Sequence, residues 1–493
     1  RLFKRYKKVI QFSILKKNYL YFFNQVVNIS VKFFNRKNSY YYKINIKYGD
    51  YFLMNSPFKI YGCSDATDFN MKNEEISVDS LVEHYKNKDY QTLVINAQKY
   101  VEKNSSSAMA WNLLALGHRY SNNVKSALKI YEDLLKLNPG NFLLSTNLGN
   151  LYMAMGKISK AINCFEIAFK KEPKHVANLE ALAIAYQDSG KNEEAIDCFK
   201  KVLDLDEKKE SSRYHLARML VRLNSYSEAI EHFHKTNYGL SKSHLLECLY
   251  YLGQKDKFYK HYRELIKRNI VNPLMASIGS HASIRFNVSN NENPFCTNPF
   301  NYIKKENITN NGELSEDLIT SILEFHQSGE SDPKSQPLLS NGKQSSGNIF
   351  LHQREDIQLL KKILDNKITN YLKEFSTSSE GFIKNWPKKY NIYGWLVSIN
   401  SGGNLAAHIH KEGWLSGSLY FKMPSKKTKD EGNIVFSFDG ANYPTDGKKF
   451  EKKSVDVYKG DLVLFPSSLF HHTVPFKSNE ERVTFAFDII PQK

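Results

Sequence analysis

A pattern of small and large apolar residues that recurs every 34 residues constrains the fold of this chain most strongly. Three phased copies begin near Trp111, Ser145 and Leu179, and a fourth follows. The recurring positions are Leu114, Ala115, His118, Ala127, Tyr131, Leu134 and Pro139, then Leu148, Gly149, Tyr152, Ala161, Phe165, Ala168 and Pro173, then Leu182, Ala183, Tyr186, Ala195, Phe199 and Val202, then Leu216, Ala217, Leu220, Ala229 and Phe233. Each copy has the spacing of two amphipathic helices, and one such hairpin cannot bury its apolar face alone. Several copies must therefore stack.

The pattern resembles the tetratricopeptide family, whose 34-residue unit has small and large apolar residues at these positions. Degenerate copies around residues 81–101 and 245–265 extend the predicted solenoid over residues 76–270. The competing interpretation is a helical domain without repeats. We favour the repeats, because three copies in phase would rarely arise by accident.

The resemblance implies that the concave face of the repeats binds a protein or peptide partner. The first helix of each unit offers a mixed set of side chains to that face, and a solvated surface would have the same composition. The positions expected to line the face are Asn112, Leu116, Arg119, Thr146, Asn150, Met153, Glu180, Ile184, Gln187, Tyr214 and Arg218.

The net charge of +18 is concentrated at the start of the chain. Residues 1–53 carry 12 Lys and Arg and one acid, Asp50, so they supply +11, and the remaining 440 residues supply only +7. This distribution argues against a nucleic-acid or membrane partner for the rest of the chain.

Residues 1–75 form a basic segment rich in Tyr, Phe and Asn, whose status the sequence leaves open. Its apolar stretch 19–27 is too short for a membrane-spanning helix, which needs about 20 apolar residues. Three interpretations compete: a targeting or membrane-surface arm, a fragment of a longer protein, and upstream sequence ahead of a true start at Met54. We assign no function to this segment.

The five cysteines point to a reducing compartment. They are scattered, odd in number, and form no CxxC pair, so neither a disulfide framework nor a zinc site is expected. We therefore expect a cytoplasmic protein. The five are Cys63, Cys164, Cys198, Cys248 and Cys296.

The helical pattern ends after Asn269. Residues 271–290 are predicted to be a linker and residues 291–493 a second domain. Helices are expected near 314–325 and 356–375. Short β-like runs follow at 392–399, 416–422, 433–438, 454–458, 461–465 and 482–489. Many short strands separated by Gly and Pro favour a jelly roll or sandwich. The predicted fold class is thus an all-α solenoid followed by a β jelly roll.

Three histidines in the β region have the layout of a metal site. His408 and His410 are separated by one residue, so a strand would project both from the same side. His471 follows a distant hydrophobic strand and would complete the set. Iron(II) oxygenases need three protein ligands on one face of the metal, with positions left for cofactor and oxygen.

A candidate carboxylate site lies close by in the sequence. Arg482 offers a planar fork that suits bidentate binding of a carboxylate. Thr484, two residues further on, would face the same side of the strand, and Tyr420 lies in another strand. Each could add a hydroxyl donor.

At these residues the sequence resembles the 2-oxoglutarate- and Fe(II)-dependent oxygenase superfamily, on its prolyl-hydroxylase-like side, and more narrowly the branch with tetratricopeptide repeats in front. The resemblance implies a double-stranded β-helix that binds Fe(II) and 2-oxoglutarate and hydroxylates a substrate with O2. His408, His410 and His471 would hold the metal, and Arg482 would complete the catalytic set. Arg482, Thr484 and Tyr420 would bind the cofactor. The matching runs are 341–350, 394–395, 403–410, 413–420, 460–471 and 482–488.

The sequence departs from the wider superfamily at His410, where the usual second ligand is Asp or Glu. Three imidazoles could hold the metal, a nearby carboxylate such as Glu412 could complete the site, or the site could be inactive. His471 is expected to face inward and the adjacent His472 outward, because only one of two neighbours can point into the site.

The expected function is hydroxylation, with the repeats recruiting a protein substrate. The alternative is a non-catalytic scaffold whose β domain only binds. A third possibility is an isomerase-type metal cupin, against which Arg482-Val483-Thr484 argues. The sequence does not reveal the substrate, the oxidised position or the oligomeric state.

Overall fold

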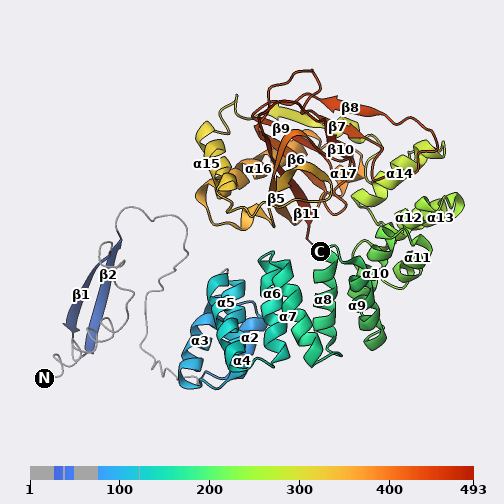
Figure 1. The fold of residues 1–493 in the computed structure, drawn as a ribbon. Coiled ribbons are helices and arrows are strands. Elements are labelled where there is room, and N and C mark those ends of the chain that lie inside the picture. The colour runs from blue at the N-terminus through green and yellow to red at the C-terminus, as the bar shows by residue number, and fades with distance from the viewer. Residues whose placement is uncertain (1–26, 37–38, 49–75, 122, 493) are drawn as a thin grey trace. The chain divides into compact units, whose positions relative to one another are not determined.

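The computed structural model describes residues 27–36, 39–48, 76–121 and 123–492 (Figure 1). The chain divides into two compact units, Arg1–Glu75 and Ile76–Lys493. In the first unit, β1 (Val27–Arg36) and β2 (Ser39–Tyr48) pair as antiparallel strands. Residues 19–26 and Met54, on which the sequence suggested several interpretations, lie outside the described residues, as does Cys63.

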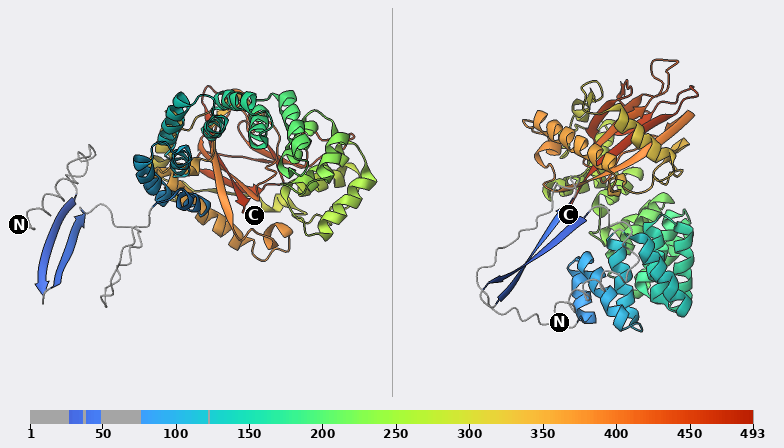
Figure 2. Two further views of the ribbon diagram at one scale, coloured as in Figure 1. Left: turned by 90° about the horizontal axis from the view of Figure 1, so that it is seen from below. Right: turned by 90° about the vertical axis from the view of Figure 1, so that its left-hand side faces the viewer.

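The second unit begins with antiparallel helices joined by short turns. In chain order they are α2 (Val78–Lys86), α3 (Tyr90–Lys103), α4 (Ala108–Tyr120), α5 (Val124–Leu137), α6 (Phe142–Ala154), α7 (Ile158–Lys171), α8 (Val176–Asp188), α9 (Asn192–Leu205), α10 (Glu210–Arg222), α11 (Tyr226–His234), α12 (Ser241–Tyr251), α13 (Lys255–Lys267) and α14 (Pro273–Arg285). The pairs α4–α5, α6–α7, α8–α9 and α10–α11 correspond to the four copies of the repeat, and the helices lie side by side along a curved row (Figure 2). The predicted helical repeats are confirmed.

Small residues at the repeat positions let the two helices of a hairpin approach closely. A Cβ added to Gly149 of α6 would lie only 2.5 Å from the Phe165 ring of α7. Ala183 of α8 is likewise fully buried. The start of α6 is capped locally: the Asn141 side chain accepts a hydrogen bond from the backbone N–H of Leu144 at 3.1 Å.

Three of the residues expected on the concave face are unavailable to a partner, because their side chains are buried or already paired within the repeats. Thr146 and Tyr214 are almost fully buried. The Glu180 carboxylate accepts a hydrogen bond from Ser212 at 3.0 Å and pairs with Lys209 at 3.1 Å. The remaining positions, among them Asn150 and Arg218 in the list given above, are partly exposed.

The predicted linker 271–290 contains the helix α14 instead. Asn272 caps its start by accepting from the Met275 N–H at 3.0 Å, and Pro273 fits the first turn. Buried residues occupy every side of this helix, so its sequence has no apolar period from which a helix could be recognised. Gly279 packs against Tyr262 of α13, which joins α14 to the array.

The rest of the unit contains two antiparallel sheets. They are preceded or flanked by α15 (Glu316–Gln327), α16 (Glu355–Glu374) and the short α17 (Gly381–Lys384), and the first two are the expected helices. The smaller sheet has the order β10-β7-β8, with β7 (Ile434–Ser437), β8 (Lys452–Val455) and β10 (Phe470–Thr473). The larger has the order β3-β9-β6-β11-β5-β4, with β3 (Lys304–Asn307), β4 (Leu339–Gln344), β5 (Tyr390–Leu405), β6 (Leu415–Lys422), β9 (Asp461–Pro466) and β11 (Arg482–Pro491).

Three of these strands lie outside the predicted runs, and β5 continues to Leu405 rather than ending at 399. β4 is polar and includes Asn341 at a φ of 47° and Gly342. β3 and β10 have only four residues each. Segments this short or this polar show no alternation of apolar residues, and pairing with their neighbours determines their conformation.

The larger sheet separates two cores. Leu419 and Phe485 belong to the core that the sheet shares with α15 and α16. The next residue along β6, Tyr420, lies on the opposite face in a cluster with Phe436 of the smaller sheet and Phe465. Because side chains alternate across a strand, this second face looks into the space between the two sheets. The candidate site residues lie there.

None of the described helices combines the length and the apolar character that crossing a membrane requires. The cysteines Cys164, Cys198, Cys248 and Cys296 are buried and unpaired. Burial raises the pKa of Cys164 and of Cys198 to about 11, so both remain neutral thiols near pH 7.

Candidate active site

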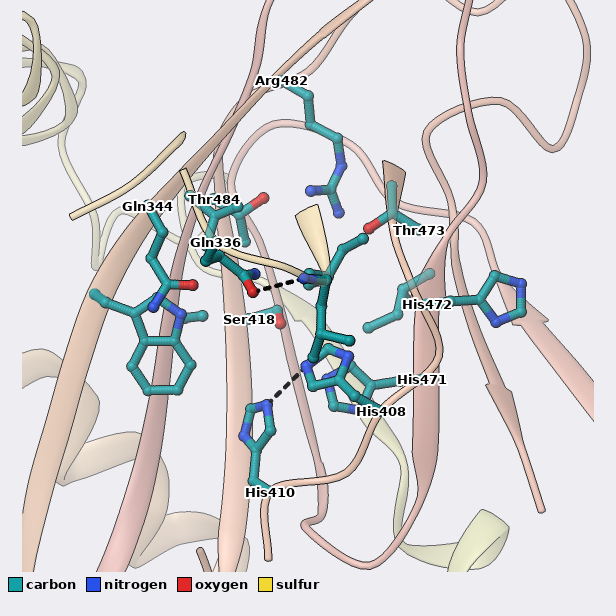
Figure 3. A pocket seen from close by; sticks show the side chains of 16 residues that line it. Gln336, Gln344, His408, His410, Ser418, His471, His472, Thr473, Arg482 and Thr484 are labelled. Carbon is teal, nitrogen blue, oxygen red and sulfur yellow. Dashed lines mark hydrogen bonds between the residues drawn. The ribbon is translucent and has the colours of Figure 1, made fainter. Parts of the chain in front are cut away.

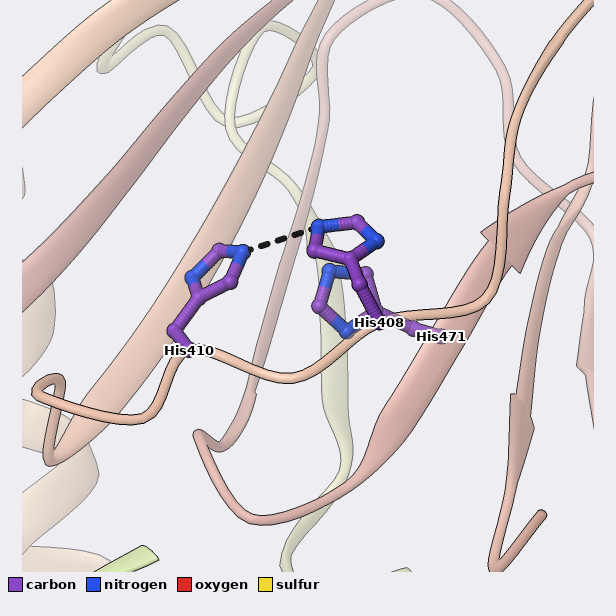
Figure 4. A group of neighbouring side chains, drawn as sticks. All are labelled: His408, His410 and His471. Atoms are coloured by element: carbon purple, nitrogen blue, oxygen red, sulfur yellow. Dashed lines mark hydrogen bonds between the residues drawn. The ribbon is translucent and has the colours of Figure 1, made fainter. Parts of the chain in front are cut away.

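Three histidines meet between the sheets (Figures 3 and 4). His408 and His471 form an isolated antiparallel bridge, in which each backbone N–H donates to the carbonyl of the other, at 3.2 and 3.0 Å. The Nε2 atoms of His408 and His410 are 3.1 Å apart, and the ligand atoms of all three histidines lie within 4.8 Å of one another. Since metal–imidazole bonds are about 2 Å long, one ion could reach all three nitrogen atoms.

The Nδ1 atom of each ring has an oxygen partner. Nδ1 of His408 donates to the carbonyl of Ala406 at 2.8 Å, and Nδ1 of His471 to that of Leu469 at 3.2 Å. Nδ1 of His410 binds Oδ1 of Asp488 at 2.6 Å. These acceptors assign the Nδ1–H tautomer to each ring, which leaves the Nε2 lone pairs facing one another. Such an arrangement could hold a metal ion.

The sequence suggested that His408 and His410 lie in a regular strand, but the structure places them in a loop that follows β5. β5 ends at Leu405, and His408 pairs with β10 through an isolated bridge. The alternation of side chains nevertheless persists over this loop: Ile409 points away from the three histidines into a core that includes Tyr443 and Phe470. The loop is thus fixed by contacts on both of its sides.

The cluster favours neutral imidazoles. Burial and the neighbouring His410 lower the pKa of His408 to about 3. Burial and His408 hold the pKa of His471 well below its usual range. Because a metal binds the unprotonated nitrogen, both rings are in the state that coordination requires at neutral pH.

Asp488 is the carboxylate next to the cluster, and the sequence did not single it out. Besides His410, its Oδ1 accepts a hydrogen bond from Ser416 at 2.7 Å, and the Ser416 hydroxyl also contacts that of Ser467 at 2.8 Å. Glu412, which the sequence suggested as a substitute ligand, is exposed and is absent from the cluster of potential ligands among the described residues. The available signal was the period of two along β11, which places Asp488 on the same face as Arg482.

Arg482 is almost fully buried, and no acidic residue pairs with it in the part of the chain that the structure describes. Its Nε donates to the carbonyl of Gly432 at 3.2 Å, and its guanidinium carbon lies 4.9 Å from the centre of the Tyr420 ring. The hydroxyl groups of Tyr420 and Thr484 are buried and have no hydrogen-bond partner. The three expected cofactor residues therefore lie close together, since Thr484 is opposite Tyr420 in the pairing of β11 with β6, but Tyr420 is not among the residues that line the pocket.

Family models match both parts of the chain. The one described as "Putative 2OG-Fe(II) oxygenase" matches residues 393–488, which contain the three histidines and Arg482. "Tetratricopeptide repeat" matches residues 119–183, and "Anaphase-promoting complex, cyclosome, subunit 3" matches 154–236. The chain therefore contains tetratricopeptide repeats and, toward its C-terminus, a domain that matches the 2OG-Fe(II) oxygenase family model.

Solved structures are similar to the repeats of this protein at low identity. MamA 41-end from Desulfovibrio magneticus RS-1 is 19% identical, with a TM-score of 0.30, and the match covers 32% of this chain and 89% of that chain. A Pseudomonas aeruginosa pilF structure is 18% identical, with a TM-score of 0.35, and covers 38% and 89%. No curated protein matches the sequence.

In the oxygenase domain, the histidines and Arg482 line one pocket of about 210 Å³ (Figure 3). Arg482 extends toward the middle of the pocket, and the ring of His472, which also lines the pocket, points away from the other three histidines. The lining contains no acidic residue: Gln336, Leu338, Gln344, Trp395, Val397, Leu405, His408, His410, Ser418, Ile434, His471, His472, Thr473, Arg482, Thr484 and Ala486. The pocket is suited to a small anion beside a metal.

Proposed function

We propose that the C-terminal domain is an Fe(II)- and 2-oxoglutarate-dependent hydroxylase. The observation that supports this most is a combination within one pocket: three imidazoles that point at one another, and a buried guanidinium without an acidic partner among the described residues. An unpaired buried charge is costly, so its presence requires a function. A metal site that used no anionic co-substrate would have no need of Arg482.

The three histidines fit a ferrous ion. His408, His410 and His471 would bind it through Nε2, with Asp488 and the two backbone carbonyls orienting the rings from behind. Imidazole is an accepted ligand of iron, and three protein ligands on one side leave positions for cofactor and oxygen. When bound, the iron and 2-oxoglutarate supply the activation of O2 for hydroxylation.

The opposite end of the pocket fits the distant carboxylate of 2-oxoglutarate. Arg482 would pair with it in a charge-assisted, fork-shaped contact, and the unpartnered hydroxyls of Tyr420 and Thr484 would donate to the same group. Burial raises the pKa of Tyr420 to about 12, so this residue remains a donor at neutral pH. Together these donors would fix the keto acid in one orientation and exclude water from its charged end.

The tetratricopeptide repeats support a protein or peptide partner, and we propose that this partner carries the substrate. The face formed by α4, α6, α8 and α10 offers partly exposed polar and apolar groups such as Asn150, Met153, Gln187 and Arg218. Such a mixed surface is suited to an extended peptide.

Release of succinate from 2-oxoglutarate by the purified full chain tests this function. We expect iron-dependent release by the wild type and a decrease of at least about tenfold in His471→Ala, because one ligand is lost. His234→Ala removes an exposed histidine of α11 and serves as the matched control. If folded, iron-supplied protein releases no more succinate than iron-free protein, the hydroxylase assignment is wrong and the non-catalytic scaffold is favoured.

A further inference from the structure

A buried carboxylate on the repeat helix α12 lies at the centre of a hydrogen-bond network that the proposed reaction does not use. Glu247 is only 2% exposed. Its two oxygen atoms accept from three side chains: Lys411 Nζ at 2.9 and 3.1 Å, the Tyr443 hydroxyl at 2.7 Å and His244 Nδ1 at 2.8 Å. Such saturation is what a buried carboxylate requires.

Two of the three donors belong to the oxygenase domain, and one of them directly follows a proposed metal ligand. Lys411 is the neighbour of His410, and Tyr443 lies in the segment between β7 and β8. On the other side of the same loop, Ile409 packs into the core that contains the repeat helices. The segment His408–Lys411 therefore contacts the repeats through its ammonium group, and its apolar residue belongs to a core that the repeats share.

We propose that Glu247 positions the loop that carries His408 and His410, so that helix α12 of the repeats forms part of the scaffold of the metal site. This inference rests on the proposed function only in taking these histidines as metal ligands. Glu247 acts through Lys411 and does not touch the metal or the cofactor.

The energetics give Glu247 a larger effect than an ordinary surface ion pair. Burial opposes its ionisation, yet the Lys411 ammonium and His244 hold the pKa of Glu247 well below its usual range. Removing the charge would leave Lys411 without its partner and Tyr443 with a weaker acceptor. His410 directly precedes Lys411 in the chain, so greater mobility of Lys411 would be transmitted to the imidazole of His410.

A second ion pair joins the same two regions and allows a control: it distinguishes positioning of the histidine loop from a general loss of contact between the repeats and the oxygenase domain. Arg285 of α14 contacts Asp446 at 2.6 Å, and Asp446 lies near Tyr443 in sequence but away from the ligand loop. Asp446→Asn breaks this contact between helix and oxygenase domain without touching the segment His408–Lys411. It is therefore the matched control.

The test is titration of the full chain with Co(II), followed by its visible absorption, which reports both affinity and the ligand geometry. Glu247→Gln and Lys411→Met should each weaken Co(II) binding by about tenfold and change the band pattern, as expected for a residue that orients a ligand. The double variant should bind no more weakly than either single one, because both act through the same contact. Asp446→Asn should remain within about twofold of wild type.

Two results would contradict the proposal, and they are distinguishable. Wild-type affinity and spectrum in Glu247→Gln, with only a lower melting temperature, would mean that Glu247 merely joins the two regions. No Co(II) binding by folded wild-type protein would instead remove the metal site itself, and with it the proposed function. If Glu247→Gln does not fold, Lys411→Met alone decides, since it leaves Glu247 with Tyr443 and His244.

Discussion

In two of the three histidines the Nδ1 atom donates to a backbone carbonyl, and in His410 it binds the side chain of Asp488 instead. Asp488 places a negative charge behind His410, the residue that stands where the wider superfamily has an acidic ligand. Asp488→Asn keeps the shape but removes this charge, so metal affinity should decrease by about 10- to 100-fold. Co(II) or Fe(II) titration measures the change, and Asp133→Asn, exposed on α5, is the control. Equal affinities would show that Asp488 serves only the packing of β11 against β6.

Arg482 provides the second prediction at this scale. Arg482→Ala removes a buried charge-assisted contact and should weaken 2-oxoglutarate binding by at least ~2 kcal/mol. Arg482→Lys keeps the charge but loses the two-pronged guanidinium contact, so its affinity for 2-oxoglutarate should lie between those of the wild type and Arg482→Ala. Calorimetric titration of metal-loaded protein measures all three. Unchanged affinity in Arg482→Ala would mean that the carboxylate is bound elsewhere.

Individual residues also show how far the sequence could predict the site. Arg482, Thr484 and the three histidines could be selected from their chemistry and spacing, and the structure brings them to one pocket. Asp488 could not be selected in this way, because 78 residues separate it from His410 and only the pairing of the strands brings the two side chains together. Glu247 belongs to a different part of the chain, and nothing in its local sequence indicates a contact with Lys411.

At the scale of helices and strands, the periodic elements were predictable and the others were not. The 34-residue spacing identified the hairpins because each one repeats the same buried positions. α14 was missed because it is buried on all sides, and β4 because its polar sequence takes its conformation from β5. The failures thus follow from tertiary contacts that local propensity does not contain.

The contact between α6 and α7 gives a stability prediction. In Gly149→Ala the new methyl group would lie 2.5 Å from the Phe165 ring, and such overpacking costs about 1–3 kcal/mol. Alanine recovers up to about 1 kcal/mol of helix propensity, so a net loss of stability is expected. Gly140→Ala, whose added Cβ would meet nothing closer than 4.0 Å, should change stability by less than about 0.5 kcal/mol. Urea unfolding compares the two, and equal effects would show that the hairpin relaxes around the methyl group.

For the second compact unit as a whole, the Glu247 network predicts a dependence of stability on pH. The pKa of Glu247 is lower in the folded chain than the value of about 4.3 of an unfolded glutamate. Its ionised form, facing Lys411, His244 and Tyr443, therefore stabilises the fold above about pH 4.3, and this contribution is lost as pH falls toward the folded pKa. The difference in melting temperature between wild type and Glu247→Gln should be largest near neutral pH and should shrink below pH 4. A difference that grows on acidification would contradict this sign.

We propose that the three imidazoles and the guanidinium that line one pocket would hold iron and a keto acid side by side. Anaerobic titration of the full chain with Fe(II) and 2-oxoglutarate tests it most directly, because a keto acid chelating ferrous iron produces a visible charge-transfer band. We predict that the band develops only when both are present and is lost in His471→Ala. Folded wild-type protein that binds Fe(II) but develops no band on addition of 2-oxoglutarate would contradict the account.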